Sequence, residues 1–170
     1  MPVVSGAEFL KAARKGGYAV GGYNTNNLEW TQAILEAAEA KKAPVLIQTS
    51  MGAAKYMGGY KVAKDMITNL VDSMNITVPV AIHLDHGDYE AALECIEVGY
   101  TSIMFDGSHL PFEENLKLAK DVVEKAHAKG ISVECEVGSI GGEEDGIIGT
   151  GELADIEECK QMVATGIDYL

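Results

Sequence analysis

The sequence predicts an α/β fold with a parallel sheet, because short apolar runs alternate along the chain with segments of helical length. Most of these runs end in polar or ionisable residues. After the first run the chain reads Gly22-Tyr23-Asn24-Thr25-Asn26-Asn27, without the G-x-G-x-x-G loop that usually follows the first strand of an open nucleotide-binding sheet. These three observations favour a closed (β/α)₈ barrel, whose site is assembled at the carboxyl ends of its strands.

The expected strands are the short apolar runs. They lie at Tyr18–Tyr23, Pro44–Gln48, Pro79–His83, Thr101–Phe105 and Ile131–Glu136, with a sixth beginning near Ile167. A complete barrel of this kind takes roughly 250 residues. We therefore expect residues 1–170 to be a single domain, a truncated part of a (β/α)₈ barrel that contains its first five to six β/α units.

The segments between the runs carry helix signals. Helical period is clear in two sets of apolar residues, Trp30, Ile34, Ala37 and Ala38 in the first and Leu116, Ala119, Val123 and Ala126 in the second. Asp88 is placed to cap a helix over Tyr89–Val98, and Pro111 suits a first helical position. Asp155 and Glu158 have the spacing of a capping box. The order of elements is therefore β-α-β-α.

Composition excludes several classes of partner. The formal charge of -13 counts against nucleic acid and anionic membrane, because either would require a basic surface. No apolar run approaches the roughly 18 residues of a membrane span, and the N-terminus lacks a signal-peptide pattern, so the cytoplasm is the expected compartment. The three cysteines form no C-x-x-C pair and predict neither disulfides nor a thiolate zinc site.

The densest chemical signal is His83-Leu84-Asp85-His86-Gly87. Side chains alternate along a strand, so His83 and Asp85 should point to one face, and Gly87 should free the backbone for His86 to turn over the end of the strand. Two imidazoles and a carboxylate suit a divalent metal, with Asp85 close enough to move protons. The alternative is that His83 is a hydrogen-bonded interior histidine and Asp85 a helix cap.

Two more strand ends carry carboxylates. Glu134 and Glu136 share one strand face, and burying both requires a cation, hydrogen bonds or a raised pKa, whereas an exposed edge strand would carry the same alternation without cost. Asp106 precedes Gly107 at the end of another run. By itself Asp106 fits a cap or turn, but beside the other two clusters it becomes a candidate secondary metal ligand.

The segment from Gly138 to about Gly151 is rich in glycine and contains the acidic run Glu143-Glu144-Asp145. Such a composition is poor in packing contacts and is typical of a mobile active-site lid, although a disordered surface linker has the same composition. We expect residues 138–146 to form a loop, and the segment to about Gly151 to be the most mobile stretch of the chain and to close over bound substrate with Glu144.

Together these motifs resemble class II fructose-bisphosphate aldolases. The resemblance rests on H-L-D-H-G at 83–87, G-Y-N-T-N-N-L-E at 22–29, F-D-G-S at 105–108, G-G-E-E-D-G at 141–146 and the segment from Gln48 to Tyr56, and it covers essentially the whole chain in order. It implies a zinc-dependent barrel enzyme that reversibly cleaves fructose 1,6-bisphosphate to dihydroxyacetone phosphate and glyceraldehyde 3-phosphate through a zinc-stabilised enediolate. It also implies a catalytic Zn²⁺, room for a second divalent ion, and a homodimer or homotetramer.

The resemblance implies a role for each matching residue. Asp85 would be the acid/base at the aldehyde-derived oxygen, and Glu144 would exchange the proton on dihydroxyacetone phosphate. His86 would bind the catalytic zinc, whereas Asp106 and Glu136 match positions that hold an alternative or inactive metal site.

Two further residues would lie near the substrate, Asn24 by the reacting carbons and Ser50 by a phosphate. In the resembling family, two more histidine ligands and the glycine-rich phosphate loops come from strands beyond Leu170, so the isolated segment is expected to be inactive. Two other interpretations stay open: a tagatose-bisphosphate aldolase, and a non-catalytic partial barrel that serves as an interaction module.

Overall fold

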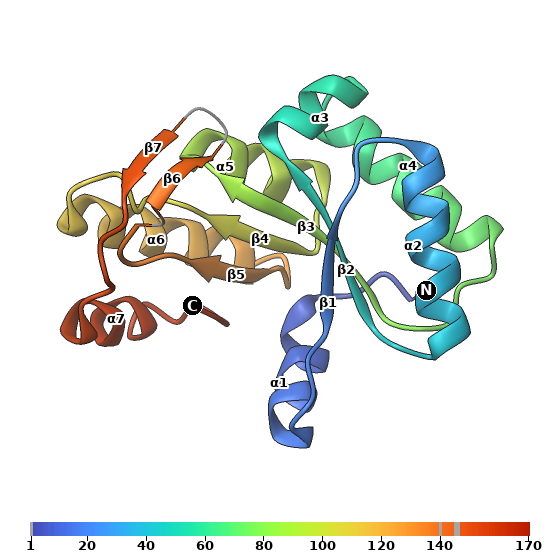
Figure 1. Cartoon of the computed structure of the whole chain (residues 1–170), viewed down its shortest axis with the longest axis horizontal. Helices are drawn as coiled ribbons and strands as arrows, with labels where there is room; N and C mark the ends of the chain where they lie inside the picture. The colour runs from blue at the N-terminus through green and yellow to red at the C-terminus, as the bar shows by residue number, and fades with distance from the viewer. Residues whose placement is uncertain (1, 140, 145–146) are drawn as a thin grey trace.

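The chain forms a five-stranded parallel sheet in which each strand pairs with the one before it in the sequence (Figure 1). The computed structural model describes residues 2–139, 141–144 and 147–170, and for 143–144 and 147–150 it describes the backbone alone. The strands are β1 (Gly21–Asn24), β2 (Val45–Ser50), β3 (Val80–Gly87), β4 (Ser102–Phe105) and β5 (Ser132–Cys135). This sequential order confirms the predicted α/β fold built from the first units of a (β/α)₈ barrel.

Helices alternate with these strands and pack against one another in chain order, α2 on α4, α4 on α5, α5 on α6 and α6 on α7. Their bounds are α1 (Gly6–Gly16), α2 (Leu28–Lys41), α3 (Met51–Met57), α4 (Tyr60–Ser73), α5 (Tyr89–Val98), α6 (Phe112–His127) and α7 (Ile156–Val163). The main core lies between this helical layer and the sheet, with Ile47, Ile82 and Ile103 fully buried in three neighbouring strands. The carboxyl ends of all five strands therefore meet at one edge.

Sequence signals located α5 and α6 well. Asp88 caps α5, whose bounds match the prediction, by accepting a hydrogen bond from the Ala91 N–H at 2.8 Å. The apolar face predicted for α6 is also confirmed, with Leu116, Ala119, Val123 and Ala126 all buried. The first strand begins three residues later than predicted because Gly17 ends α1 in the left-handed conformation and the Tyr18 N–H still bonds back to the Ala13 carbonyl.

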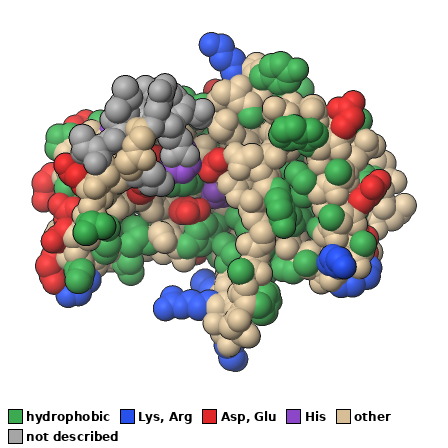
Figure 2. Space-filling view, in the orientation of Figure 1, with side chains coloured by type: hydrophobic (Ala, Val, Ile, Leu, Met, Phe, Trp, Pro, Cys, Tyr) green, Lys and Arg blue, Asp and Glu red, His purple; other side chains and the backbone are tan. Residues whose placement is uncertain are grey.

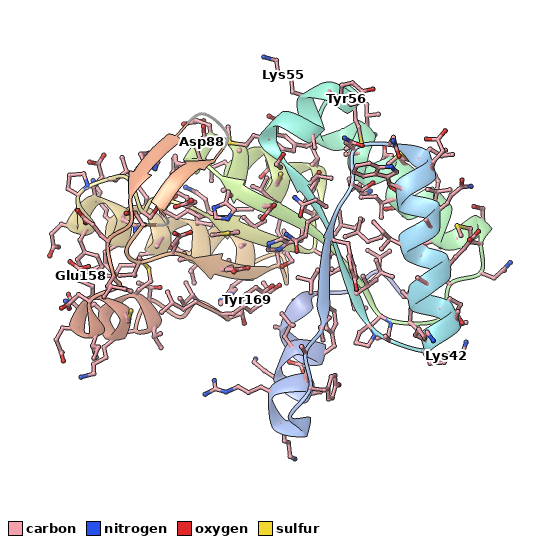
Figure 3. The ribbon with its side chains drawn as sticks, viewed as in Figure 1. Lys42, Lys55, Tyr56, Asp88, Glu158 and Tyr169 are labelled. Atoms are coloured by element: carbon pink, nitrogen blue, oxygen red, sulfur yellow. The ribbon has the colours of Figure 1, made fainter. Side chains whose placement is uncertain are left out.

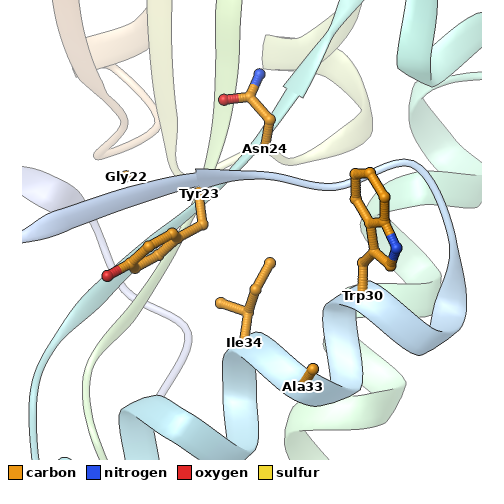
Figure 4. Close-up of a pocket in the computed structure, with 6 residues that line it drawn as sticks. All are labelled: Gly22, Tyr23, Asn24, Trp30, Ala33 and Ile34. Atoms are coloured by element: carbon orange, nitrogen blue, oxygen red, sulfur yellow. The ribbon is translucent and has the colours of Figure 1, made fainter.

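The apolar face predicted for α2 is confirmed at Ala38, which is buried, and at Ile34, which packs against the core, but Thr31 and Leu35 are buried in place of Trp30 and Ala37. Thr31, Leu35 and Ala38 are buried, because the Thr31 hydroxyl pairs with the Thr25 hydroxyl at 2.8 Å and so turns that face inward. Trp30 and Ile34 instead line a pocket of about 350 Å³ beside β1 (Figure 4). A helical period identifies an apolar stripe, but a hydrogen-bonded hydroxyl can move its centre.

The prediction that residues 138–146 form a loop is wrong in its secondary structure. The strands β6 (Gly141–Glu144) and β7 (Ile147–Thr150) pair in an antiparallel hairpin. Gly138 permits its close entry, since a Cβ there would lie 2.8 Å from the Glu152 carbonyl oxygen and its φ is +83°. The sequence interpretation weighed the glycines and acids above the β-branched run that forms β7. Closure of the segment over substrate stays a prediction.

The loop between α4 and β3 is held to α2 by one carboxylate. Glu39 accepts hydrogen bonds from the Thr77 N–H at 2.7 Å and the Thr77 hydroxyl at 2.8 Å, and it pairs with Lys42. The bond from Lys42, followed by those from Thr77, lowers the pKa of Glu39 from 4.5 to about 2. The folded state therefore stabilises the ionised form of the Glu39 carboxyl more than the unfolded state does.

Glu39→Gln is expected to lower the free energy of unfolding at pH 6, with a difference from wild type that shrinks as the pH falls. A depressed folded-state pKa gives stability that is complete above the unfolded value near 4.5 and is lost as the pH falls through about 2. Urea unfolding at pH 6, 4 and 3, followed by Trp30 fluorescence, measures this. Glu36→Gln, on the same helix, is the control, and a pH-independent loss at Glu39 would contradict the explanation.

Candidate metal centre and active site

The end of β3 departs from regular strand geometry where the predicted site begins. The β3–β4 register pairs Leu84 with Ile103 and then Gly87 with Phe105, so one residue is inserted between them. His86 takes the left-handed conformation with φ of +49°, a strained state that concentrates at functional sites. The turn therefore occurs at His86 itself. The sequence predicts instead that the backbone of Gly87 allows it. Gly87 instead leaves room for buried Leu84, since a Cβ there would lie 2.3 Å from Leu84 Cδ2.

Three predicted metal residues from three successive strand ends lie together. His86 Nδ1 is 2.8 Å from Asp106 Oδ2 and 3.7 Å from Glu136 Oε2. One potential ligand atom from each residue lies within 4.8 Å of the others, and all three side chains are half-buried. Figure 2 shows histidine and carboxylate side chains gathered near the middle of the face in view. One imidazole and two carboxylates are a donor set that binds divalent transition metals.

Asp106 is held in place from both sides. Its N–H donates to the Gly87 carbonyl at 2.9 Å, and its Oδ1 accepts from the Ser108 N–H at 2.9 Å. Burial alone would raise the pKa of Asp106, but the hydrogen bonds from His86 and Ser108 outweigh it and hold the pKa at about 2. Asp106 therefore stays anionic over the working pH range and is available to a cation.

Glu134 lies two residues before Glu136, and its pKa shifts in the opposite direction to that of Asp106. Burial raises the pKa of Glu134 to about 7, and the charges of Asp85 and Glu136 add to the rise while His86 opposes it. β5 is the last strand of the described sheet, but both glutamates are half-buried, so they are not the exposed pair that the alternative interpretation expected. β5 pairs with β4 on one side, and Glu134 forms a parallel bridge with Tyr169 on the other.

The predicted catalytic and substrate residues Asp85, Asn24 and Ser50 come from three adjacent strands. Asp85 Oδ2 accepts a hydrogen bond from Asn24 Nδ2 at 2.6 Å, and Ser50 lies opposite Asp85 in the β2–β3 register. Ser50 also caps α3 by accepting from the Ala53 N–H at 3.2 Å. On β1, Asn24 and Tyr23 leave the strand on opposite sides (Figure 4). The structure therefore brings Asn24 and Ser50 beside Asp85, and a phosphate contact of Ser50 stays a prediction.

Two predicted residues have different outcomes. The backbone of Glu144 lies in β6, but its side chain is outside the described residues, so its catalytic role stays a prediction. His83 is 2% exposed, and its Nδ1 lies 2.8 Å from the Ser102 hydroxyl. Burial lowers the pKa of His83 to about 4. It is the hydrogen-bonded interior histidine that the sequence left as an alternative, and it lies outside the His86 metal group.

Sequence reasoning missed the polar residues around His83. Ser102 and Ser132 are buried on β4 and β5, and Tyr169 bonds to both hydroxyls. The available signal was a serine at the same point of two consecutive apolar runs, Thr101–Phe105 and Ile131–Glu136. None of the helices in the described part of the chain has the length and apolar character required to cross a membrane.

A parallel (β/α) sheet with polar and ionisable side chains gathered at its carboxyl edge is the arrangement of (β/α)-barrel enzymes. The family model for class-II fructose-bisphosphate aldolase matches residues 4–170, and the chain belongs to this family. This agrees with the resemblance found in its motifs.

Individual relatives agree in fold and sequence. The chain is 82% identical over 170 residues to a fructose-bisphosphate aldolase of Streptococcus pneumoniae, covering all of this chain and 58% of the relative. It is 55% identical to a fructose-bisphosphate aldolase of Geobacillus stearothermophilus over 173 residues, covering all of this chain and 60% of that one. A crystal structure from Coccidioides immitis, assigned to a fructose-1,6-bisphosphate aldolase, matches with a TM-score of 0.85 and 34% identity over 98% of this chain and 59% of the other. The chain thus spans less than two thirds of these relatives.

Proposed function

We propose that this chain supplies the acid/base and part of the metal site of an aldolase that reversibly cleaves fructose 1,6-bisphosphate to dihydroxyacetone phosphate and glyceraldehyde 3-phosphate. The observation that carries the proposal is the group of His86, Asp106 and Glu136 beside Asp85 at the carboxyl edge of the sheet. Family membership supports the same reaction and a sugar-phosphate substrate.

The residues present fit a divalent metal. An imidazole nitrogen and two carboxylate oxygens lie close enough to share one ion, and the low pKa of Asp106 keeps one carboxylate charged. His86 would bind a catalytic Zn²⁺, and Asp106 and Glu136 would hold an alternative position or a second divalent ion. Zn²⁺ supplies Lewis-acid polarisation of a carbonyl when bound.

Asp85 moves the proton at the oxygen that becomes the aldehyde. In the cleavage direction its carboxylate takes the proton of the C4 hydroxyl as the bond between C3 and C4 breaks, and in condensation it returns that proton to the aldehyde oxygen. The 2.6 Å bond from Asn24 orients the carboxylate for this transfer. Glu144, if β6 and β7 close over the site, exchanges the proton on the carbon next to the ketone of dihydroxyacetone phosphate.

The remaining parts of the proposal follow from the family. Asn24 contacts the substrate near the reacting carbons, and Ser50 lies by a phosphate, next to Asp85 in the sheet. The complete enzyme works in the cytoplasm, in glycolysis and gluconeogenesis, as a homodimer or homotetramer. Size-exclusion chromatography with light scattering measures the last point directly.

Steady-state cleavage by the complete polypeptide that carries these residues tests the function. We expect turnover of fructose 1,6-bisphosphate to exceed that of its epimer tagatose 1,6-bisphosphate, to disappear after chelation and to return with Zn²⁺. The isolated 1–170 chain should be inactive, since family ligands from later strands are not part of it. Zinc-loaded complete protein that cleaves neither bisphosphate would refute the proposal, and a preference for tagatose bisphosphate would correct the substrate.

A further inference from the structure

A chain of hydrogen-bonding groups runs through the interior from the start of α1 to the edge of the active site. It links groups from four elements and from the segment after α7, in the order Gly6, Ser132, Tyr169, Ser102, His83 and Glu134. Figure 3 shows Tyr169 below β5 and beside the start of α1. The reaction proposed above involves Asp85, His86, Glu136 and Glu144. It assigns no role to this chain of hydrogen-bonding groups.

The links are close and mostly buried. The Gly6 N–H donates to the Ser132 hydroxyl at 3.2 Å, and that hydroxyl lies 2.8 Å from the Tyr169 hydroxyl. The Tyr169 and Ser102 hydroxyls are in hydrogen-bond contact. Gly6 is required for this approach, because a Cβ there would lie 2.8 Å from the Tyr169 hydroxyl oxygen. The start of α1 is therefore packed directly against the polar interior.

At the other end, the chain reaches Glu134 through the His83 ring. Nδ1 is hydrogen-bonded with the Ser102 hydroxyl at 2.8 Å, and Nε2 makes a longer polar contact with Glu134 Oε2 at 3.5 Å. His83 and Ser102 face each other in the β3–β4 register, which fixes this spacing through the backbone. The ring thus bridges a fully buried hydroxyl and a carboxylate of the active site.

The chemistry of the groups gives the chain one direction. Above pH 7, where Glu134 is ionised, its carboxylate only accepts, so His83 Nε2 carries the proton and Nδ1 of the neutral ring accepts from Ser102. Ser102 then accepts from the Tyr169 hydroxyl, and Tyr169 accepts from Ser132, which accepts from the Gly6 N–H. Each hydroxyl donates once and accepts once within the chain, and the Thr101 carbonyl, 3.4 Å from the Ser132 hydroxyl, is a longer alternative acceptor for the Ser132 proton. The chain fixes both the tautomer and the orientation of His83, because reversing one link would leave two donors or two acceptors facing each other.

The position of Glu134 affects the neighbouring side chains of the site. Leu84 and Val133 both pair with Ile103, so Asp85 and Glu134, the residues that follow them, lie in the same row of the sheet. Asp85 is held on its other side by Asn24. A Glu134 carboxylate fixed in position therefore repels the Asp85 carboxylate toward Asn24, whereas a Glu134 free to rotate would release it.

We propose that His83 is a positioning residue of this site, which holds Glu134 beside Asp85 through a hydrogen-bond chain anchored at the first residue of α1. This inference rests on the proposed aldolase reaction for its effect on turnover. The His83 tautomer and ring orientation can be measured without that reaction.

Two substitutions of His83 separate positioning from packing. An asparagine amide lies near the site of Nδ1 and keeps the link to Ser102, whereas a glutamine amide reaches the site of Nε2 and keeps a donor for Glu134. In the complete polypeptide, His83→Asn loses the donor for Glu134 and should lower kcat at least about tenfold, in the range typical of outer-shell partners of metal sites, whereas His83→Gln keeps that donor but loses the link to Ser102 and should lower kcat less, about as much as Tyr169→Phe. KM and zinc content should change less than about twofold in both, since neither variant removes a substrate contact or a proposed metal ligand.

Tyr169→Phe breaks the chain by removing one oxygen and should lower kcat with unchanged KM and zinc content. Tyr100→Phe is its matched control, because Tyr100 is buried and its hydroxyl bonds to the Thr49 hydroxyl at 2.8 Å, outside the chain. This variant should retain wild-type kcat. Thermal melting confirms that the variants compared are folded, and Tyr169→Phe keeps the test open if both His83 variants unfold.

Nitrogen-15 NMR of histidine-labelled protein supplies the readout that does not depend on turnover. The His83 signal, identified by its loss in whichever His83 variant folds, should report a neutral ring protonated at Nε2 when measured well above pH 7, where Glu134 is ionised, and Tyr169→Phe should shift it. Equal kcat in the asparagine and glutamine variants, unchanged kcat in Tyr169→Phe, or a ring protonated at Nδ1 would each overturn the inference. Wild-type protein without turnover would instead refute the proposed function. The NMR measurement of the His83 ring would still show whether the hydrogen-bond chain fixes its tautomer.

Discussion

His86→Ala in the complete polypeptide is expected to lose most of its bound zinc and to lose turnover with it. His86 contributes the imidazole nitrogen of the group with Asp106 and Glu136, and its ring lies 2.8 Å from Asp106 and 3.7 Å from Glu136. Removing it leaves two carboxylates that repel each other and no nitrogen donor from this part of the chain. Metal analysis after dialysis, together with kcat, measures both effects.

The loss of turnover should exceed the roughly 10- to 100-fold cost of removing an outer-shell partner of a metal site. His127→Ala is the control, since His127 is paired with Asp168 at 2.9 Å on the outer helix α6 and should keep wild-type zinc. Full zinc retention by His86→Ala would exclude His86 as a ligand. Retention of zinc with lost turnover would instead indicate that Asp106 and Glu136 hold the ion with later residues.

Much of the fold can be predicted because its strongest signals are local. An apolar run followed by a cap residue, such as Asp88 before α5, identifies a strand-to-helix transition without tertiary information. The apolar face of α6 was equally readable, since Leu116, Ala119, Val123 and Ala126 repeat at helical spacing. The errors arose where a distant or polar contact decided the outcome. Thr31 turned α2 by pairing with Thr25, and β7 formed a hairpin with a segment that was read as glycine-rich loop.

The candidate site shows the same division. Parallel strands bring their carboxyl ends together, so a prediction that Asp85, His86, Asp106 and Glu136 are neighbours follows from topology once the strands are located. What topology does not give is side-chain conformation. The left-handed backbone of His86 and the interior position of His83 depend on the register shift in β3 and on Ser102 across the sheet. The motif alone could not distinguish the role of His83 from that of His86, because both residues are histidines.

Asp85→Ala is expected to reduce kcat by roughly 10²- to 10⁴-fold, the usual contribution of a general acid/base, while zinc content stays near wild type. Asp85 bonds to Asn24 at 2.6 Å and lies outside the group formed by His86, Asp106 and Glu136, so its removal takes away a proton carrier and leaves the ligand atoms in place. KM should change little if Asp85 acts mainly in the transition state.

Asp85→Asn distinguishes the charge from the shape at this position. The amide keeps the size of the side chain and can still accept a hydrogen bond from Asn24, but it cannot take up the hydroxyl proton, so its kcat should be as low as that of Asp85→Ala. Asp72→Ala, on the exposed side of α4, is the control for removing a surface carboxylate and should be fully active. A loss of kcat smaller than about tenfold would contradict the acid/base role. Loss of zinc would point to Asp85 as a ligand, because a residue that only carries protons has no reason to change how much metal the protein holds.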